Sequence, residues 1–324
     1  MKQNLKKSHE HPLASVIIPT KNSEETIGKC LQAICNQQLC DFEIIIIDSG
    51  SQDRTLEIVK EYATLIKEVS PDKFSHGYVR NVGSELAKGE VLVYLNQDAI
   101  PASDLWLNNL LEPLREKDVA ASYARQLPNS TTNPVERFFL FKTYSATPKI
   151  HTRKDLYKQS PENFVLLSTV SAAVKRDIWE KFRFHDKVIM SEDQELAVRL
   201  LESGYKIAYQ PESEVMHSHN YSIWNLFRRY FDSGWSMVKV VKLRGSSILK
   251  SLKYPIILIT ETLDYIGASV INNRVYWAFY ALLCNLTKAL GFALGTRQKY
   301  MPKSLINTLS YTLSKKREYK LSND

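Results

Sequence analysis

A short apolar run, VLVYL at Val91–Leu95, breaks abruptly into the polar residues Asn96, Gln97 and Asp98. Five consecutive apolar residues are typical of a strand that is buried on both faces of a parallel sheet. In an open α/β sheet, ligands bind beyond the carboxyl ends of the strands. We therefore expect Asp98 to face a substrate or a metal ion, and the rest of the chain is interpreted relative to it.

Earlier apolar runs alternate with helical patterns. Ser23 is expected to cap a first helix, a second helix follows the turn after Asp48, and a third covers about residues 78–87. This βαβα winding predicts an α/β fold with a largely parallel sheet. The strands predicted before Val91 are Ala14–Pro19, Phe42–Ile47 and Leu65–Val69.

The second half of the chain continues the alternation. We expect Ser103 or Asp104 to cap a helix, and an amphipathic helix to run from Ser191 to Ser203. Segment 127–164 contains an aromatic cluster and a polar stretch, and this composition predicts a mobile loop over the site. Further strands are predicted at Val119–Arg125, Ser168–Val174, Tyr205–Tyr209 and Glu214–His219.

Charge is unevenly distributed along the 324 residues. From Val241 to Asp324 there are 13 Lys and Arg against 4 Asp and Glu, whereas the rest of the chain carries 30 against 31. The net charge of +8 therefore belongs to the C-terminal quarter. With 44% hydrophobic residues, the chain can form one large domain, or one domain with an appendage.

The cysteines argue against an extracellular protein. Cys30, Cys35, Cys40 and Cys284 show no paired spacing and are interpreted as reduced cytosolic thiols. The opening MKQNLKKSHEHP is basic but lacks the apolar core and the cleavage site of a signal peptide, so we do not expect secretion.

Polar residues stand where strands end or helices begin. Taken singly, Asp48 and Asp98 are ordinary turn formers, and Arg80 is an ordinary solvated helix residue. Because the carboxyl ends of parallel strands converge, together they predict a nucleotide pocket, with acids for a base or ribose and for a divalent metal, and a cation for phosphate. The four places are Thr20–Asn22, Asp48, Arg80 with Asn81, and Asn96–Asp98.

The segment MSEDQELAVRLLESG places two acids at the start of a helix. Ser191 and Gln194 form an S-x-x-Q capping box, which puts Glu192 and Asp193 in the first turn. Acids in this position complement the helix dipole whatever their function. The same dipole keeps a carboxylate ionised, as a general base for a hydroxyl requires.

Other side chains leave two interpretations open. In MHSHN, His217 and His219 share one face of a strand and either ligate a metal or are structural. Trp106, Trp179 and Ser171 either contact a sugar or pack in the core.

Four motifs in order resemble glycosyltransferase family 2, which consists of inverting enzymes with the GT-A fold. They are SVIIPTKN, IIIIDSGSQDRT, RNVGSELAKGEVLVYLNQDA and SEDQELAVRLLESGYKI, and the resemblance covers about residues 13–220. It implies a Rossmann-like, mostly parallel mixed sheet with helices on both faces. Within the family, FSHGYVRN, LNQDA and HSHNYS look most like bacterial rhamnosyltransferases of surface polysaccharide assembly.

The resemblance also implies roles for individual residues. Asp193, in the pair with Glu192, matches the catalytic base, and Asp98 matches the last acid of the family's D-x-D motif, which holds Mg²⁺ or Mn²⁺ on the diphosphate. His217 or His219 completes the metal shell. The remaining matched positions bind the nucleotide-sugar: Pro19, Thr20 and Asn22 at the nucleoside, Asp48 at the base, Arg80 near the nucleotide, and Asn96 and Gln97 as neutral contacts to the donor. The family pattern has an acid at the position of Asn96. Its replacement leaves Asp98 as the one carboxylate of this motif that can bind the metal.

The implied reaction moves rhamnose from dTDP-rhamnose to a polyprenyl-diphosphate-linked glycan, with Asp193 taking a proton from the acceptor hydroxyl. One alternative is another nucleotide-sugar such as a UDP-sugar. A sugar nucleotidyltransferase is disfavoured because no Gly-rich triphosphate loop follows the first strand. Because Asn96 replaces an acid, a catalytically silent nucleotide-binding or membrane scaffold protein is a further alternative.

The C-terminal quarter contains an apolar stretch, Val275–Gly295, that as a helix would be about 30 Å long, enough to span a bilayer. Lys288 interrupts it, near enough to the end to snorkel. A second apolar stretch, Ile256–Ile266, contains two acids, and this mixture favours amphipathic helices in the membrane interface.

The basic charge is sufficient for peripheral binding to the cytosolic face of a bacterial inner membrane. The alternative is a soluble helical cap that forms a homodimer. Nucleic acid is a poor fit, since no motif of a known nucleic-acid-binding module occurs. We predict a disordered tail at 1–12, a catalytic domain at 13–220 and a basic, membrane-associating helical region at 221–324.

Overall fold

The computed structural model describes residues 11–156, 165–243, 263–267 and 275–314. The chain divides into two compact units. Unit 1 comprises residues 1–129, 141–187 and 192–218, and unit 2 comprises residues 130–140, 188–191 and 219–324. Residues 1–10 of the tail predicted at 1–12, most of Ile256–Ile266 and the basic end of the chain at 315–324 lie outside the described residues.

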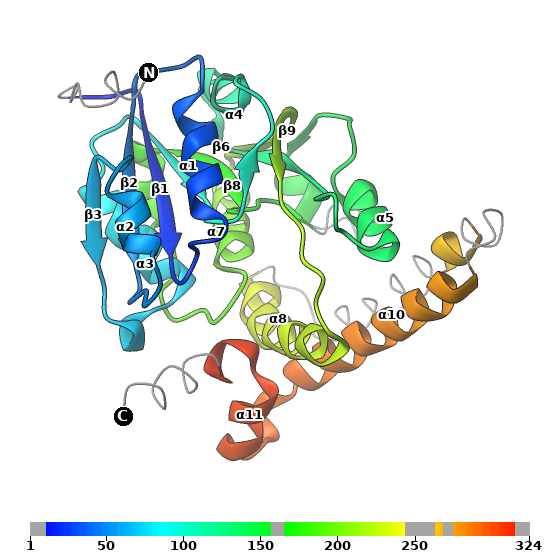
Figure 1. The fold of residues 1–324 in the computed structure, drawn as a ribbon. Helices are drawn as coiled ribbons and strands as arrows, with labels where there is room; N and C mark the ends of the chain where they lie inside the picture. Colours follow the sequence, from blue (N-terminus) through cyan, green and yellow to red (C-terminus); the bar gives the residue numbers. More distant parts are fainter. Residues whose placement is uncertain (1–10, 157–164, 244–262, 268–274, 315–324) are drawn as a thin grey trace. The chain divides into compact units, whose positions relative to one another are not determined.

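Unit 1 is built on a single mixed sheet (Figure 1). The strand order is β3-β2-β1-β4-β8-β6-β9-β5, and β7 also pairs with β9. Neighbours run parallel from β3 to β4, and β8 runs antiparallel between β4 and β6. The strands are β1 (Ala14–Thr20), β2 (Phe42–Asp48), β3 (Leu65–Glu68), β4 (Val91–Leu95), β5 (Ile100–Pro101), β6 (Val119–Leu127), β7 (Lys149–His151), β8 (Ser171–Lys175) and β9 (Lys206–Met216).

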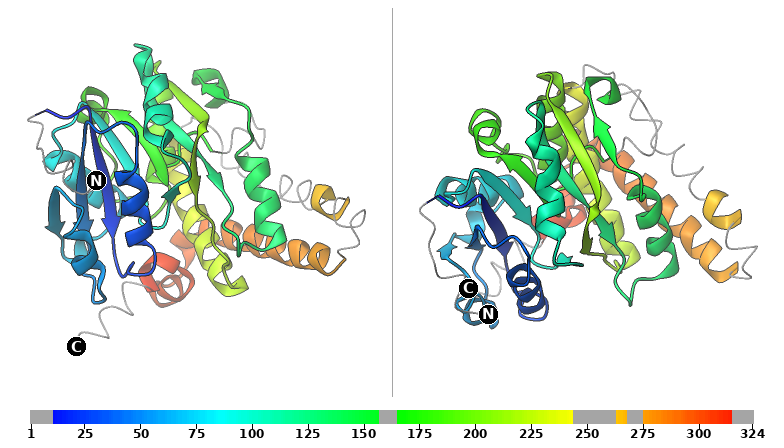
Figure 2. Two further views of the ribbon diagram at one scale, coloured as in Figure 1. Left: turned by 45° about the horizontal axis from the view of Figure 1, so that its top comes forward. Right: turned by 90° about the horizontal axis from the view of Figure 1, so that it is seen from above.

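Helices cover both faces of this sheet (Figure 2). Alternate residues of β1 point to opposite faces, so Val16 and Ile18 pack with Leu31 of α1 while Ile17 lies against α3. The α/β fold predicted from the apolar runs is therefore confirmed. The helices of unit 1 are α1 (Ile27–Cys35), α2 (Thr55–Val59), α3 (His76–Leu86), α4 (Trp106–Leu111), α6 (Arg176–Phe182) and α7 (Glu192–Glu202).

Several local predictions were wrong. Ser23 does not cap α1, because its side-chain Oγ lies 3.4 Å from Thr55 Oγ1 and its carbonyl closes a turn with Thr26, so the helix begins at Ile27. Helix α4 begins at Trp106 without a side-chain cap from Ser103 or Asp104. Segment 127–164 contains α5 (Pro134–Thr143) and β7 instead of one long loop. The two short strands predicted over 205–219 form the single, irregular strand β9.

Unit 2 is helical. Its helices α8 (Ile223–Leu243) and α10 (Val275–Gly295) pack against each other (Figures 1 and 2), and α11 (Lys303–Leu309) follows. By length and hydropathy, α10 qualifies as a membrane span, although 44% of the qualifying window is buried inside the protein. Lys288 does not snorkel from the helix end as predicted, because its side chain is buried.

Gly83 sets the distance between α3 and the sheet. A Cβ at this position would overlap Ile17 Cγ2 and lie 3.3 Å from Ile47 Cγ1. We expect Gly83→Ala to lower the free energy of unfolding by about 1–3 kcal/mol, because the buried side chains of β1 and β2 leave no room for it. Denaturant titration with Gly28→Ala as control checks this. A Cβ on Gly28 would meet only Ile58 Cγ2 at 3.7 Å; equal losses in both variants would contradict the packing argument.

Candidate active site

The residues predicted from strand ends meet at one edge of the sheet in unit 1. Thr20 is paired with Asp48 where β1 and β2 end. Because β8 is antiparallel to β4, its first residue, Ser171, pairs with Leu95 at the same edge. β6 and β9 run parallel to each other and antiparallel to β8, so their carboxyl ends also lie there. This edge is the position expected for a ligand site in an open α/β sheet.

Asp48 organises the loops that follow β1 and β2. It is fully buried, and its carboxylate accepts hydrogen bonds from Thr20 Oγ1 (2.9 Å), Ser51 Oγ (2.6 Å), Gly50 N (2.9 Å) and Ser51 N (2.8 Å). A carboxylate offers about four acceptor sites, so the chain itself uses Asp48 fully. The predicted contact from Asp48 to the base stays a prediction, and it requires one of these bonds to be exchanged.

Asn22 joins the same two loops. It has a φ of 45°, a left-handed conformation that Asn tolerates better than most residues. Its N–H donates to Ser51 Oγ (2.9 Å) and its Oδ1 accepts from Gln52 N (2.8 Å). The loop after Pro19 and Thr20, predicted to line the nucleoside site, is thereby held against the loop after β2 before any ligand binds.

Gln97 connects the end of β4 to the loop after β1. Its Oε1 accepts from Lys21 N (2.7 Å) and its Nε2 donates to Lys21 O (3.2 Å). The predicted contact from Gln97 to the donor therefore stays a prediction, since both ends of the amide already have partners. Lys21 lies within the predicted Thr20–Asn22 part of the pocket, but the resemblance assigned it no role of its own. Burial lowers the pKa of Lys21, and the nearby charge of Asp48 opposes this shift.

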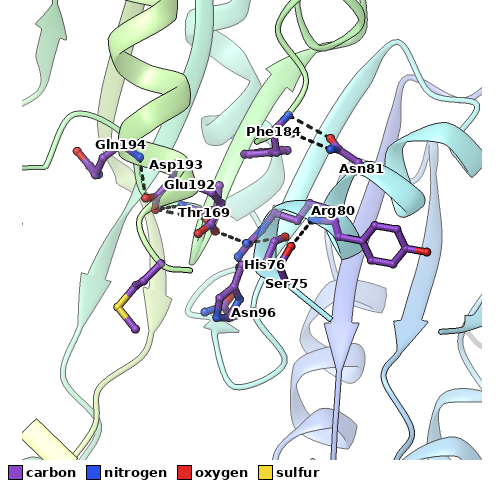
Figure 3. A network of polar contacts seen from close by, with 12 residues as sticks. Ser75, His76, Arg80, Asn81, Asn96, Thr169, Phe184, Glu192, Asp193 and Gln194 are labelled. Carbon is purple, nitrogen blue, oxygen red and sulfur yellow. Dashed lines mark hydrogen bonds and ion pairs between the residues drawn. The ribbon is translucent and has the colours of Figure 1, made fainter. Parts of the chain in front are cut away.

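Arg80 lies in the buried polar network of Figure 3. It is 3% exposed, forms an ion pair with Glu192 at the start of α7, and donates to Asn96 Oδ1 (3.3 Å) and to the carbonyl of His76 (3.2 Å). It thereby ties α3, the end of β4 and α7 together. The predicted contact of Arg80 to a nucleotide stays a prediction, because both terminal nitrogens of the guanidinium already have these partners. Asn96, which stands where the family has an acid, is one of them.

Asp193 stands next to this network and is half-buried. Its Oδ2 accepts from the N–H (3.2 Å) and the hydroxyl (3.4 Å) of Thr169, and its Oδ1 accepts from Gln194 N (2.8 Å). Burial, with a further contribution from the charge of Glu192, raises the pKa of Asp193 to about 6, while Arg80 opposes the shift. A carboxyl with such a pKa accepts a proton more readily than an ordinary one and is still ionised at neutral pH.

The predicted capping box at this helix was wrong. Gln194 turns away from Ser191, because its Oε1 accepts from Leu166 N (3.1 Å) and its Nε2 donates to the carbonyl of Leu167. Ser191 itself has a φ of 65°, an uncommon conformation for a residue other than Gly, Asn or Asp. Gln194 therefore anchors the segment before β8, which carries Thr169, next to Asp193.

The raised pKa of Asp193 predicts an acidic limit to activity. If Asp193 takes the proton, kcat/KM should fall about tenfold per pH unit below about pH 6, because the protonated acid cannot act as a base. Glu192→Gln removes a like charge, so it should lower the pKa of Asp193 and move this limit to lower pH. Rates measured from pH 4.5 to 8 check both results. An unmoved limit in Glu192→Gln would show that another group controls it.

Asp98 and His217 form the candidate metal site. Asp98 Oδ1 lies 3.6 Å from Nε2 of the buried His217, while His217 Nδ1 lies 2.8 Å from Gln126 Oε1 and donates to it. A histidine that binds a metal through one nitrogen commonly donates its other N–H to a carbonyl in this way. Two donor atoms, each about 2.1 Å from one ion, lie about 3.0–3.6 Å apart for angles of about 90–120° at the ion, so the separation of the pair fits a divalent cation. His219, the other predicted histidine ligand, follows two residues later in the chain, and its place in the metal shell stays a prediction.

The sequence-predicted sugar contacts belong to the core. Trp106 is fully buried and donates from Nε1 to Ser171 Oγ (3.0 Å), and Trp179 donates to Asn81 Oδ1 (3.1 Å). The packing interpretation of both tryptophans is confirmed. Two residues of the site were not predicted. Ser51, which donates to Asp48, could have been found from the small and acidic residues that alternate in the turn DSGSQD. Gln126, which accepts from His217, has no local sequence signal.

Comparison with known proteins identifies the family to which the chain belongs. The profile of glycosyl transferase family 2 matches residues 15–182, more than half of the chain. The chain belongs to glycosyl transferase family 2. This family 2 glycosyltransferase is 30% identical to the O-antigen chain rhamnosyltransferase WbaN of Salmonella anatum, over 94% of this chain and 99% of that protein. It is 29% identical to RfbN of Salmonella typhimurium, also an O-antigen chain rhamnosyltransferase, over 93% and 98% respectively.

Solved structures confirm the fold of this family 2 glycosyltransferase. The mannosyltransferase PcManGT from Pyrobaculum calidifontis, solved in complex with GDP-Man and Mn²⁺, superposes with a TM-score of 0.61. The two chains are 19% identical, and the match covers 92% of this chain and 91% of the other. The GT-A-like fold expected from the sequence resemblance is therefore present.

Proposed function

We propose that this glycosyltransferase moves rhamnose from dTDP-rhamnose to a polyprenyl-diphosphate-linked glycan. The observation that carries the proposal is the match to two O-antigen chain rhamnosyltransferases over nearly the whole of both chains. A match of this extent includes unit 2 as well as the catalytic fold, whereas the family profile ends at residue 182.

The reaction follows from the placement of Asp193. Its carboxylate takes the proton of the acceptor hydroxyl while that oxygen forms a bond to the anomeric carbon of the donor. The bond from this carbon to the nucleoside diphosphate breaks, the diphosphate leaves with the bonding electrons, and the configuration inverts. Thr169 and Gln194 hold the carboxylate through hydrogen bonds to both of its oxygens. Arg80 holds Glu192 and so fixes the start of α7.

Asp98 and His217, with His219, would hold a divalent cation such as Mg²⁺ or Mn²⁺. When bound, such an ion supplies positive charge that offsets the charge of a leaving diphosphate. We expect EDTA to abolish activity and Mn²⁺ to restore it. Asp98→Ala should weaken Mn²⁺ binding at least tenfold, measured by the EPR signal of free Mn²⁺ with dTDP present. Asp104→Ala, which removes an exposed acid bonded to Gln38, should not change it.

The donor is tested without knowing the acceptor sugar. Purified protein is screened by thermal shift against dTDP, UDP and GDP, and by slow hydrolysis of dTDP-rhamnose, UDP-glucose and GDP-mannose. We expect stabilisation by dTDP above the other nucleotides and release of rhamnose. A preference for uridine nucleotides would overturn rhamnose transfer but keep the glycosyltransferase. Absence of hydrolysis with every donor would favour a silent binding protein.

We further propose a cytoplasmic protein that is peripheral on the cytosolic face of the membrane, where a lipid-linked acceptor would be presented. The support is the basic excess after Val241. A homodimer through the C-terminal helices is the alternative use of this region, and vesicle binding together with light scattering separates the two.

A further inference from the structure

Helix α10 presents two different faces. One face is buried and contains the small residues Ala278, Ala281 and Gly291. Gly291 lies against Phe227 of α8, and Ala281 packs with Val135 and Phe139 of α5. The opposite face is apolar and exposed; its Tyr276 is 71% exposed and its Phe279 70% exposed. We call this exposed face the α10 stripe, and it consists of Tyr276, Phe279, Leu282, Leu283, Leu286 and Leu290. Side chains at these spacings lie on one side of a helix, so the stripe is a continuous apolar surface.

The polar residues of α10 do not interrupt the stripe. Asn285 and Lys288 are buried on the other face. The Lys288 ammonium lies 4.7 Å from the ring centre of Phe139 and 5.6 Å from that of Tyr230. These aromatic contacts within unit 2 hold the charge away from the exposed side. The stripe therefore has the composition of a surface that would dock on an apolar medium, without a charge in it.

α10 is fixed to α8 by close backbone contacts. A Cβ on Gly234, Gly291 or Gly295 would overlap a carbonyl oxygen of the facing helix. Crossing a bilayer on α10 would therefore carry α8 along, together with its buried Arg228 and Asp232. Ionised side chains are costly at that depth. The pair is better suited to lie on a bilayer, with the stripe inserted and α8 on the side away from the lipid.

The charge of α10 and of the residues after it indicates which partner docks on the α10 stripe. From Val275 to Arg317 the chain has seven Lys and Arg and neither Asp nor Glu. Three of these cations, Arg297, Lys299 and Lys303, are exposed just after the stripe. A second copy docked through the same surface would bring these like charges together, whereas anionic lipid headgroups complement them. We propose that the α10 stripe docks flat on an anionic lipid bilayer, a mode that deepens the proposed peripheral location and holds whichever sugar is transferred.

Vesicle binding by the full chain tests the surface. Wild-type protein should co-sediment with vesicles of 70% phosphatidylcholine and 30% phosphatidylglycerol, and less with phosphatidylcholine alone. Phe279→Glu with Leu286→Glu should lower the partition coefficient at least tenfold, because both side chains would leave the apolar phase. Leu105→Glu with Ile150→Glu is the matched control, since these apolar residues are exposed on unit 1. Thermal melting verifies folding, and hydrolysis of the donor reports separately on the proposed function.

Measuring the depth of two positions of α10 in the bilayer distinguishes a helix that lies flat from one that spans the bilayer. Nitroxide labels are placed on Phe279→Cys and on Leu290→Cys, in a protein whose exposed Cys40 is replaced by Ser. The two positions are 11 residues, or about 16 Å, apart along the helix. Equal depths in the bilayer are expected, and depths that differ by most of this length would overturn the flat orientation. Absence of vesicle binding by the wild type would overturn the proposal. So would a double variant that still binds vesicles but loses a dimer seen by light scattering.

Discussion

Asp193→Asn should lower kcat by about 10²–10⁴, the usual cost of losing a positioned general base. The amide keeps the size and shape of the carboxylate but cannot take a proton from the acceptor hydroxyl. Its oxygen can still accept from Thr169 N, as Asp193 does now at 3.2 Å, whereas the amide nitrogen cannot accept from Gln194 N. Thermal melting of the variant checks that the start of α7 stays in place. Single-turnover transfer and donor hydrolysis measure the chemical step, and thermal shift with dTDP measures nucleotide binding, which should be unchanged.

The matched control for this prediction is Asp177→Asn. Asp177 also lies in the first turn of a helix, but its side chain is 64% exposed and paired with Lys181, at 3.5 Å in the same helix. The Asp177→Asn variant should transfer sugar at the wild-type rate. Near-wild-type turnover in Asp193→Asn would remove Asp193 from the base role and leave Glu192 as the remaining acid of the pair.

Strand ends were predictable because their signals are local. An apolar run that stops at a polar residue marks both a buried strand and its end, and this placed Asp48 and Asp98 at the correct edge of the sheet. The order of the strands adds information that no local pattern contains. β8 enters between β4 and β6, and this brings Thr169 and Gln126 to the same edge as Asp98.

Roles within the site were less predictable than positions. The sequence indicates that Asp48 and Arg80 lie near a nucleotide, but it does not indicate that their polar atoms are already paired with Ser51 and Glu192. Burial decides this, because a buried charge is stable only with a partner. Helix starts failed for a related reason. Ser23 bonds Thr55 at the start of α2, so a tertiary contact replaced the local cap.

Arg80→Met should lower the free energy of unfolding by about 3–5 kcal/mol, the usual cost of removing one partner of a buried ion pair. Glu192 is 4% exposed and would lose its cation, so it would be desolvated without compensation. The same change removes an attraction that opposes the raised pKa of Asp193. The acidic limit of kcat/KM should therefore move to higher pH, opposite to the shift expected for Glu192→Gln. Denaturant titration and a pH profile measure the two effects.

A double variant separates a broken ion pair from lost packing. Arg80→Met with Glu192→Met replaces the pair by apolar side chains, so it should be more stable than Arg80→Met alone even though it carries two changes. As an exposed control, Arg54→Met removes an ion pair with Glu57 whose side chains are 71% and 68% exposed, and it should leave the unfolding midpoint unchanged. If the double variant were less stable than Arg80→Met, the contacts of Arg80 with Asn96 and the carbonyl of His76 would outweigh its pairing with Glu192 in holding α3, β4 and α7 together.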